Sequence, residues 1–272
     1  NAGLVGSEMC IRDRYYPPGA LDLPESGEVA IYPLTAKDEL LLKTPDSLMN
    51  GTATADVIKS CVPAIKNPWY MPSLEVDALI IAIRIATYGE KMTITIKVPN
   101  IGDEKDYEID LNTIMAPLMS ATYENVIQMD NMKITLRPLM YTEFTKDAMR
   151  SFEEQRVYNL INDDTIPAEE KMERFRTAFN KLTDLTVETV AKSIAKIELM
   201  AGQVVNDPKH ILEFMQNTSK EFYTTILDHI GEQRDKFAVK PFIANTTKEE
   251  QEKGAPETFE VPITFDQSNF FV

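Results

Sequence analysis

The sequence predicts an α+β protein in which antiparallel hairpins and long helices occupy different parts of the chain. Residues 92–98 alternate between apolar and polar side chains, and residues 107–111 repeat the alternation after a turn, as two paired strands with one buried face would. From residue 141 to residue 237 the apolar spacing instead follows the helical repeat. A last alternating segment at residues 259–265 predicts a C-terminal strand that returns to the sheet.

The first 14 residues, NAGLVGSEMCIRDR, are expected to stand outside this fold. They resemble a translated sequencing adaptor and show neither helical nor strand periodicity, so we expect a non-native segment without regular structure. On this interpretation the natural start and a few native residues are absent. Without the segment the net charge stays at −15 and Cys61 is the sole cysteine.

Three regions are expected in the rest of the chain. They are an α+β domain at 15–140, a helical region at 141–237, and a C-terminal strand and tail at 238–272. The helical region is predicted to contain three helices, at about 142–161, 168–203 and 208–236. In the middle helix, an apolar stripe runs through Met172, Phe175, Phe179, Leu182, Thr186 and Val190. Such a stripe packs within its own chain by default, or offers a face to a partner.

The first region contains the most apolar segment of the chain. Residues 74–88 predict a helix in the middle of the fold, with Ser73 as N-cap and with Ile81 and Ile85 inaccessible to solvent. Residues 20–33 alternate around a Pro/Gly turn and predict a hairpin. Short helices at 36–43 and 54–62 and a second strand pair at 125–129 and 133–137 complete the region.

Composition narrows the class of partner. A net charge of −15 argues against nucleic acid and against an anionic membrane surface, because both attract basic proteins. The apolar run at residues 78–83 is far shorter than the roughly 20 residues that span a bilayer. A single cysteine permits no disulfide framework, which fits a reducing compartment. We therefore expect a soluble protein that is intracellular when made.

Catalytic motifs are missing from the sequence. It has no GxxxxGK[ST] or GxGxxG loop, no GxSxG elbow and no HExxH pair. His210 and His229 are 19 residues apart, which is about 30 Å along an unbroken helix, so they cannot share a metal. Cys61 fits a buried structural thiol better than a nucleophile. We expect no catalytic residue and no cofactor; an enzyme with an unrecognised site is the weakest alternative.

Five residues are candidates for binding a partner. Trp69 and Tyr70, in a proline-bracketed loop, fit either an exposed interface anchor or a lid on the protein's own core. Arg84, the one charge inside the apolar run of the 74–88 helix, either pairs with an interior acid or faces a partner. Phe270 and Phe271, at the end of the chain, either dock into the chain's own sheet or insert into a neighbour.

Four strings in order carry a family resemblance: IYPLTAKDELLL at 31–42, DVIKSC at 56–61, DALIIAIRIA at 77–86 and PITFDQSNFF at 262–271. Together they are similar to the baseplate hub subunit family of T4-like (T-even type) contractile-tail phages. The resemblance covers about residues 30–137, the C-terminus locally, and the helical middle only by length and character. It implies a structural role in assembling the central hub on which the tail tube is initiated, and it brings no catalytic residue.

The chain departs from this family at a metal-binding motif. Many similar members carry a CPxCG knuckle where this chain has VPNIG at 98–102, and a second cysteine pair where it has residues 246–257. Val98 and Ile101 occupy the ligand places and bind no metal, so the knuckle is degenerate and we expect no structural zinc. In its place we expect Val98 and Ile101 to pack against C-terminal residues such as Phe259 or Val261.

The sequence therefore predicts an acidic subunit of the phage baseplate hub that acts by binding other proteins. Its expected partners are other hub or tail proteins, including the tape-measure protein, with no nucleic acid and no membrane. It is expected in the host cytoplasm during assembly and in the tail baseplate if the virion retains it. The alternative is a tail-assembly chaperone that binds the tape-measure protein or a hub component and is absent from the mature virion.

Overall fold

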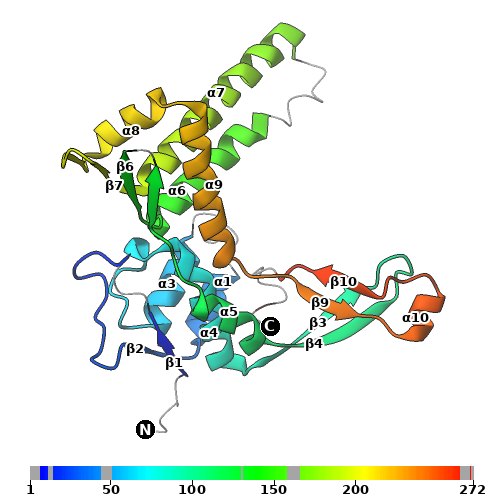
Figure 1. Cartoon of the computed structure of the whole chain (residues 1–272). Helices are drawn as coiled ribbons and strands as arrows, with labels where there is room; N and C mark the ends of the chain where they lie inside the picture. The colour runs from blue at the N-terminus through cyan, green and yellow to red at the C-terminus, as the bar shows by residue number, and fades with distance from the viewer. Residues whose placement is uncertain are drawn as a thin grey trace.

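The computed structural model describes residues 7–11, 15–43, 51–129, 131–157, 166–263 and 270. It is a mixed α+β structure with antiparallel sheets, as the sequence predicts. Figure 1 shows a central body, a helical part above it that ends in a projecting arm, and a pair of hairpins that extends to one side.

The helices and strands have the following bounds. The helices are α1 (Ala36–Leu42), α3 (Thr52–Cys61), α4 (Val76–Tyr88), α5 (Leu111–Ser120), α6 (Tyr141–Gln155), α7 (Ala168–Lys192), α8 (Pro208–Asn217), α9 (Lys220–Lys236) and α10 (Lys248–Glu252). The strands are β1 (Ser7–Cys10), β2 (Glu28–Ile31), β3 (Lys91–Lys97), β4 (Glu104–Asp110), β5 (Val126–Met129), β6 (Met132–Leu136), β7 (Ile194–Leu199), β8 (Val204–Val205), β9 (Phe242–Asn245) and β10 (Thr258–Val261). Short 3₁₀ turns, η2 (Pro68–Tyr70) and η3 (Ser73–Glu75), precede α4.

Helix α4 forms the centre of the body, as predicted. Seven consecutive residues, 78–84, are buried in it, and Ile81 is fully inaccessible. Two details of the prediction are wrong. Ile85 is only half-buried because it lies in the last turn, and Ser73 does not cap α4 because it begins the 3₁₀ turn η3.

The N-terminal segment is not without regular structure, which corrects the expectation for residues 1–14. Strand β1 pairs antiparallel with β2, and Met9 is buried in the main core. The expected hairpin at 20–33 is also wrong: its turn forms, but Leu21 bridges Ile65, and β2 takes β1 as its partner. Alternation identifies the buried face of a strand and not the strand it pairs with.

The predicted strand pair at 125–129 and 133–137 forms β5 and β6, and two strands that the sequence did not predict, β7 and β8, extend it to a four-stranded sheet. Its strands run in the order β5-β6-β7-β8, so it joins segments from both sides of residue 141. The predicted helix at 168–203 ends at Lys192, and residues 194–199 form β7 instead. The buried residues of β7, Ile194 and Ile197, are three apart, a spacing that also fits a helix.

The predicted helix at 208–236 is divided into α8 and α9. Helix α8 ends at Asn217, and the side chain of Ser219 accepts a hydrogen bond from the backbone N–H of Phe222 at the start of α9. A serine in this position caps a new helix instead of continuing the old one. Helices α8 and α9, the sheet β5-β6-β7-β8 and the C-terminal end of α7 share a second hydrophobic core.

Two hairpins pack against each other at the side of the body (Figure 1). Strand β3 pairs with β4, and β10 pairs with β9. The ring of Tyr107 on β4 lies edge-on to Phe242 and Phe259, with ring centroids 6.2 and 6.0 Å away. The first hairpin and the final strand therefore lie together, although β10 forms its hydrogen bonds with β9. On the side of the first hairpin, the apolar cluster between them contains Tyr107, Ile94 and Ile96 and not the predicted Val98 and Ile101.

Candidate protein-binding surface

The two aromatic candidates in the proline-bracketed loop have different surroundings. Trp69 is half-buried and stacks on Tyr141, with ring centroids 5.5 Å apart and planes 24° apart. Tyr141 in turn donates a hydrogen bond to the carbonyl oxygen of Gly51 at 3.4 Å. Tyr70 is exposed. Trp69 therefore packs against Tyr141 within the chain, while Tyr70 faces solvent.

Arg84 and Phe270 contact each other inside the chain. Arg84 is buried, and its Nε donates to the carbonyl oxygen of Phe270 at 2.8 Å, while Nη1 donates to that of Gly89 at 3.3 Å. Its guanidinium also lies over the ring of Tyr88, and burial lowers its pKa. Phe270 is buried in the main core. These contacts hold Phe270 against α4. Phe271 lies outside the described residues.

The two segments in which the resemblance led us to expect a degenerate metal knuckle, 98–102 and 246–257, contact each other. Val98 is buried and Ile101 half-buried. The side-chain amide of Asn100 donates to the carbonyl oxygen of Gly254 at 3.1 Å, and Lys105 pairs with Glu250 at 2.9 Å. A hydrogen bond and an ion pair therefore link the two segments. In the described part of the chain no group of three or more His, Cys, Asp or Glu side chains is placed to bind a metal.

Other reactive residues are dispersed. Burial raises the pKa of Cys61 to about 12, so its thiol stays protonated at neutral pH. His210 lies on α8, and His229 lies on α9, where its Nε2 is 2.8 Å from the carbonyl oxygen of Glu124. These residues do not form a nucleophile and base pair.

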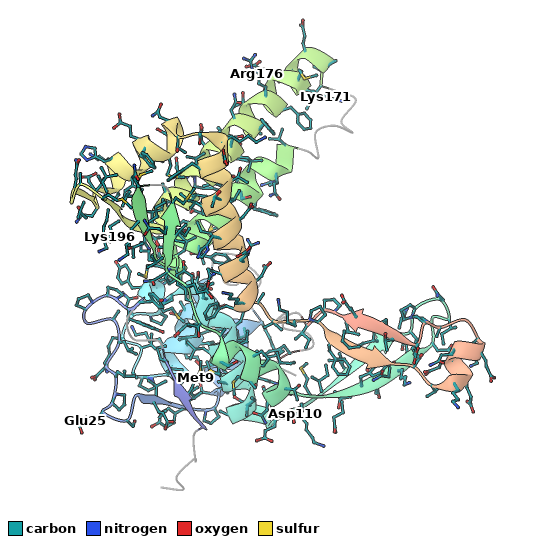
Figure 2. All side chains as sticks on the ribbon, viewed as in Figure 1. Met9, Glu25, Asp110, Lys171, Arg176 and Lys196 are labelled. Atoms are coloured by element: carbon teal, nitrogen blue, oxygen red, sulfur yellow. The ribbon has the colours of Figure 1, made fainter. Side chains whose placement is uncertain are left out.

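The apolar stripe of α7 is largely uncovered. Met172 is 71% exposed and Phe179 64% exposed, although a stripe of this kind packs within its own chain by default. On the neighbouring helix α6, Phe152 is 53% exposed and Phe144 48% exposed. Figure 2 shows this arm projecting from the rest of the molecule, with Lys171 and Arg176 near its end. We call the residues Met172, Phe175, Phe179, Leu182 and Thr186 the α7 stripe.

Two ion pairs link the helices of the arm. Arg150 on α6 pairs with Glu188 on α7 at 2.7 Å, and Lys181 on α7 pairs with Glu154 on α6 at 2.9 Å. They lie on a different side of α7 from the stripe, because positions 181 and 188 are more than a quarter-turn from 179 and 186 at ~100° per residue. The two ion pairs therefore leave the face of α7 that carries Met172 and Phe179 exposed.

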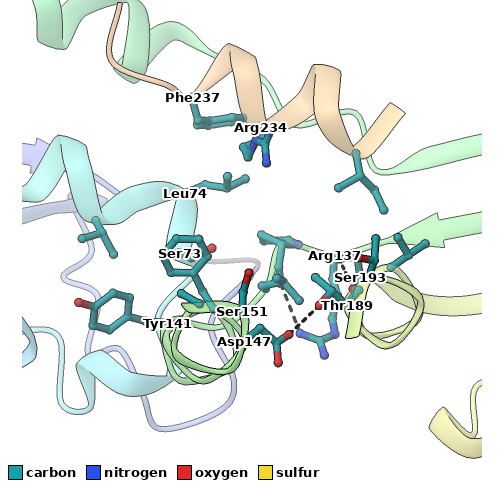
Figure 3. Close-up of a pocket in the computed structure, with 18 of the residues that line it drawn as sticks. Ser73, Leu74, Arg137, Tyr141, Asp147, Ser151, Thr189, Ser193, Arg234 and Phe237 are labelled. Carbon is teal, nitrogen blue, oxygen red and sulfur yellow. Dashed lines mark hydrogen bonds between the residues drawn. The ribbon is translucent and has the colours of Figure 1, made fainter. Parts of the chain in front are cut away.

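A cavity of about 690 Å³ opens at the base of the arm. It lies between the start of α4, helices α6 and α7, and the end of α9 (Figure 3). In Figure 3, Phe237 and Arg234 lie on one side and Ser151 and Asp147 on the other, with Leu74 between them. Leu182 and Thr186 of the α7 stripe also line it. The stripe therefore leads directly out of the cavity.

Most charges in the cavity wall are neutralised within the chain. Arg137 donates to both carboxylate oxygens of Glu143, at 2.8 and 2.7 Å. Asp147 accepts from Lys192 at 2.7 Å and from the hydroxyl of Thr189 at 2.9 Å. Such charge-assisted bonds satisfy buried ions. The lining is otherwise mainly apolar.

Asp77 is the exception in the cavity wall. Within the described residues, its partly buried carboxylate has neither a hydrogen bond nor an ion pair, and burial raises its pKa to about 6. Asp77 was not among the residues predicted from the sequence, although Arg84 of the same helix was. The available signal was an acid at the second position of the most apolar helix, which an N-terminal helix dipole readily explains.

Taken together, the fold and this surface define an α+β protein with an incompletely covered apolar face, the kind of surface that binds another protein. The chain belongs to the T4 bacteriophage base plate protein family, whose model matches residues 20–259. Among curated proteins and among solved structures, no match was found. Family membership implies a structural role in the baseplate of the phage tail, in contact with other tail or baseplate proteins. No helix in the described ranges is long and apolar enough to cross a membrane.

Proposed function

We propose that the protein is a structural and assembly subunit of the central hub of a contractile-tail baseplate, and that it acts by binding other hub or tail proteins. The observation that carries the proposal is the uncovered α7 stripe on an arm that projects from the body. Family membership supports the assignment to the baseplate. The assignment to the hub of the baseplate rests on the resemblance of four ordered sequence strings to hub subunits.

The physical reason for a partner is the exposed apolar surface itself. Each large apolar side chain left in water forgoes about 1.5–3 kcal/mol of burial free energy. Met172 and Phe179 lie on one face of α7, and two phenylalanines of α6 are also exposed. In a protein with a net charge of −15, charge repulsion keeps the free subunit dispersed until a complementary partner covers this face.

Localisation within the virion tests the proposed function. The protein should be present in purified virions at a fixed ratio to other baseplate proteins, measured by quantitative mass spectrometry. A gold-labelled affinity tag should appear at the centre of isolated baseplates in electron micrographs. Detection only in infected-cell extracts would support the assembly chaperone instead, and label at the baseplate periphery would contradict the hub.

A matched pair of variants tests the binding surface. Phe179→Asp places a charge on the α7 stripe, while Asn180→Asp makes the same change about 100° around the helix. Both side chains are exposed, so both variants should fold. Only Phe179→Asp should fail to enter particles when it complements a phage that lacks the gene. Equal incorporation of both variants would show that the stripe binds no essential partner.

A further inference from the structure

We propose that the cavity and the α7 stripe form one groove that receives an amphipathic helix of a tail or baseplate protein, with a lysine or arginine of that helix seated against Asp77. The inference rests on the proposed function and adds to it the chemistry of the partner. It is carried by the continuity of the groove, by its length and by its one uncompensated charge.

The groove is continuous because the stripe lies on one face of a single helix. From Thr186 and Leu182 in the cavity wall, the stripe continues outward at intervals of three or four residues. This is the spacing that places side chains in one row on a helix. Beyond the cavity, Phe179 and Met172 are exposed on this same face of α7.

The length of the groove defines the occupant. From Val190 in the cavity to Met172 there are 18 residues, which at ~1.5 Å per residue is about 27 Å. An occupant helix of about 18 residues would cover this length. It would present apolar side chains at positions i, i+3, i+4 and i+7, as helices that bind in grooves do.

The walls of the cavity are suited to such apolar side chains. Phe144 and Ala148 of α6 form one wall, and Leu227 and Ile230 of α9 form another. Figure 3 shows Tyr141 at the α6 side of the cavity, where Trp69 stacks on it. At the inner end of the site, Tyr141 is positioned by the ring of Trp69 and by the carbonyl oxygen of Gly51.

The charge of the occupant follows from a census of the ionisable lining. Six titratable or charged side chains line the cavity. Asp77 comes from α4, Tyr141 and Asp147 from α6, Arg234 from the end of α9, and Tyr123 and Arg137 from the segments before β5 and after β6. Arg137 and Asp147 are neutralised by their own partners. Arg234 has its own ion-pair partner, because its Nε lies 4.0 Å from a carboxylate oxygen of Asp235. Covering the cavity therefore leaves one unpaired ion, the Asp77 carboxylate.

A buried carboxylate without a partner is strongly unfavourable, so an occupant that covers Asp77 needs a cation. A second copy of this chain fits poorly, because two subunits of net charge −15 repel each other. A basic amphipathic helix from a different protein has the complementary charge and shape.

The experiment uses the purified full-length chain on an array of overlapping 20-residue peptides. The peptides cover the tail and baseplate proteins encoded by the same phage, and the chain itself. The peptides that bind should have apolar residues at helical spacing and one lysine or arginine. Their affinities are then measured by fluorescence anisotropy with Asp77→Asn and with Asp184→Asn as the matched control. Asp184 is an exposed acid on α7 that does not line the cavity.

Asp77→Asn should weaken the best peptide at least about tenfold at pH 7.5, while Asp184→Asn should leave its affinity unchanged. Replacing the basic residue of the peptide with norleucine should remove the difference between wild type and Asp77→Asn. The affinity for the basic peptide should fall as the pH drops through about 6, where the carboxylate takes up its proton.

Three outcomes would overturn the inference. They are that no peptide distinguishes Asp77→Asn from Asp184→Asn, that the preferred peptides are acidic, or that the peptides that bind come only from this chain. The last outcome would make the groove a contact between two copies. These results are independent of where the protein lies in the virion. The inference can therefore fail while the proposed function stands, and the proposed function can fail while the inference stands.

Discussion

Helices α4 and α7 are both rich in apolar residues, but the structure covers only one of them. In α4, seven consecutive residues are buried by the surrounding body. In α7, which has 25 residues, only Ala178, Leu185, Val190 and Ala191 are buried, while Met172 and Phe179 face solvent. The comparison separates apolar residues that form the chain's own core from apolar residues that the fold leaves exposed.

The largest expected effect is in the body. Ile81→Ala should lower the free energy of unfolding by about 2–5 kcal/mol, because Ile81 is fully buried and the substitution leaves a cavity. Urea titration followed by circular dichroism measures it. A loss below about 1 kcal/mol would show that α4 can rearrange around the gap and is not the rigid centre of the body.

A smaller loss of stability is expected where Phe270 contacts Arg84 of the body. Arg84→Met should cost about 2 kcal/mol, because it removes hydrogen bonds from a charged donor to the carbonyl oxygens of Phe270 and Gly89. Phe270→Ala disrupts the same attachment, so the two losses should not add in the double variant. Strict additivity in urea titrations would mean that Arg84 and Phe270 act independently.

At the cavity the expected effect is a gain in stability. Burial raises the pKa of Asp77 to about 6, above the value of about 3.9 in an unfolded chain. The folded state therefore holds the proton more tightly, and this group lowers stability as the pH rises from about 4 to about 6. Asp77→Asn should add about 1–2 kcal/mol at pH 7.5, a value reduced for partial exposure, and nothing at pH 3.5. A gain that is the same at both pH values would rule out ionisation as its cause.

The smallest effect on folding is expected on the arm. Phe179→Ser should change the free energy of unfolding by no more than about 0.5 kcal/mol, because an exposed side chain makes few contacts to lose. Thermal denaturation of the variant and of wild type measures the difference. A loss as large as that of Ile81→Ala would show that Phe179 belongs to the subunit's own core.

Sequence patterns identified the body more accurately than the second region. The apolar run of α4 covers nearly the whole circumference of the helix, so the helix has to be buried, and its position was predicted closely. Strand β7 was missed because Ile194 and Ile197 repeat at helical spacing, and only pairing with β6 makes them a strand. Strand β1 was missed because its partner, β2, is 18 residues away, and local periodicity contains no pairing information.

The candidate surface was predictable in its residues but not in its exposure. The stripe from Met172 to Thr186 is visible in the sequence, yet spacing alone does not say whether the chain supplies a cover. The cavity depends on helices that are distant in sequence, and the isolation of Asp77 is a property of their packing. For Phe270 the sequence left open whether the side chain is buried in its own chain or binds a neighbour. The structure buries it in the main core, and its carbonyl oxygen accepts a hydrogen bond from Arg84 of α4.

Cysteine protection on the arm tests the central claim most directly. Phe179→Cys and Asn180→Cys are each labelled with a maleimide, in the isolated subunit and in purified virions, and peptide mass spectrometry measures the extent at each site. Both thiols should react rapidly in the isolated subunit, because both positions are exposed. In virions, Phe179→Cys should be protected at least about tenfold relative to Asn180→Cys. Equal labelling of the two sites in virions would contradict the claim that another protein covers the α7 stripe.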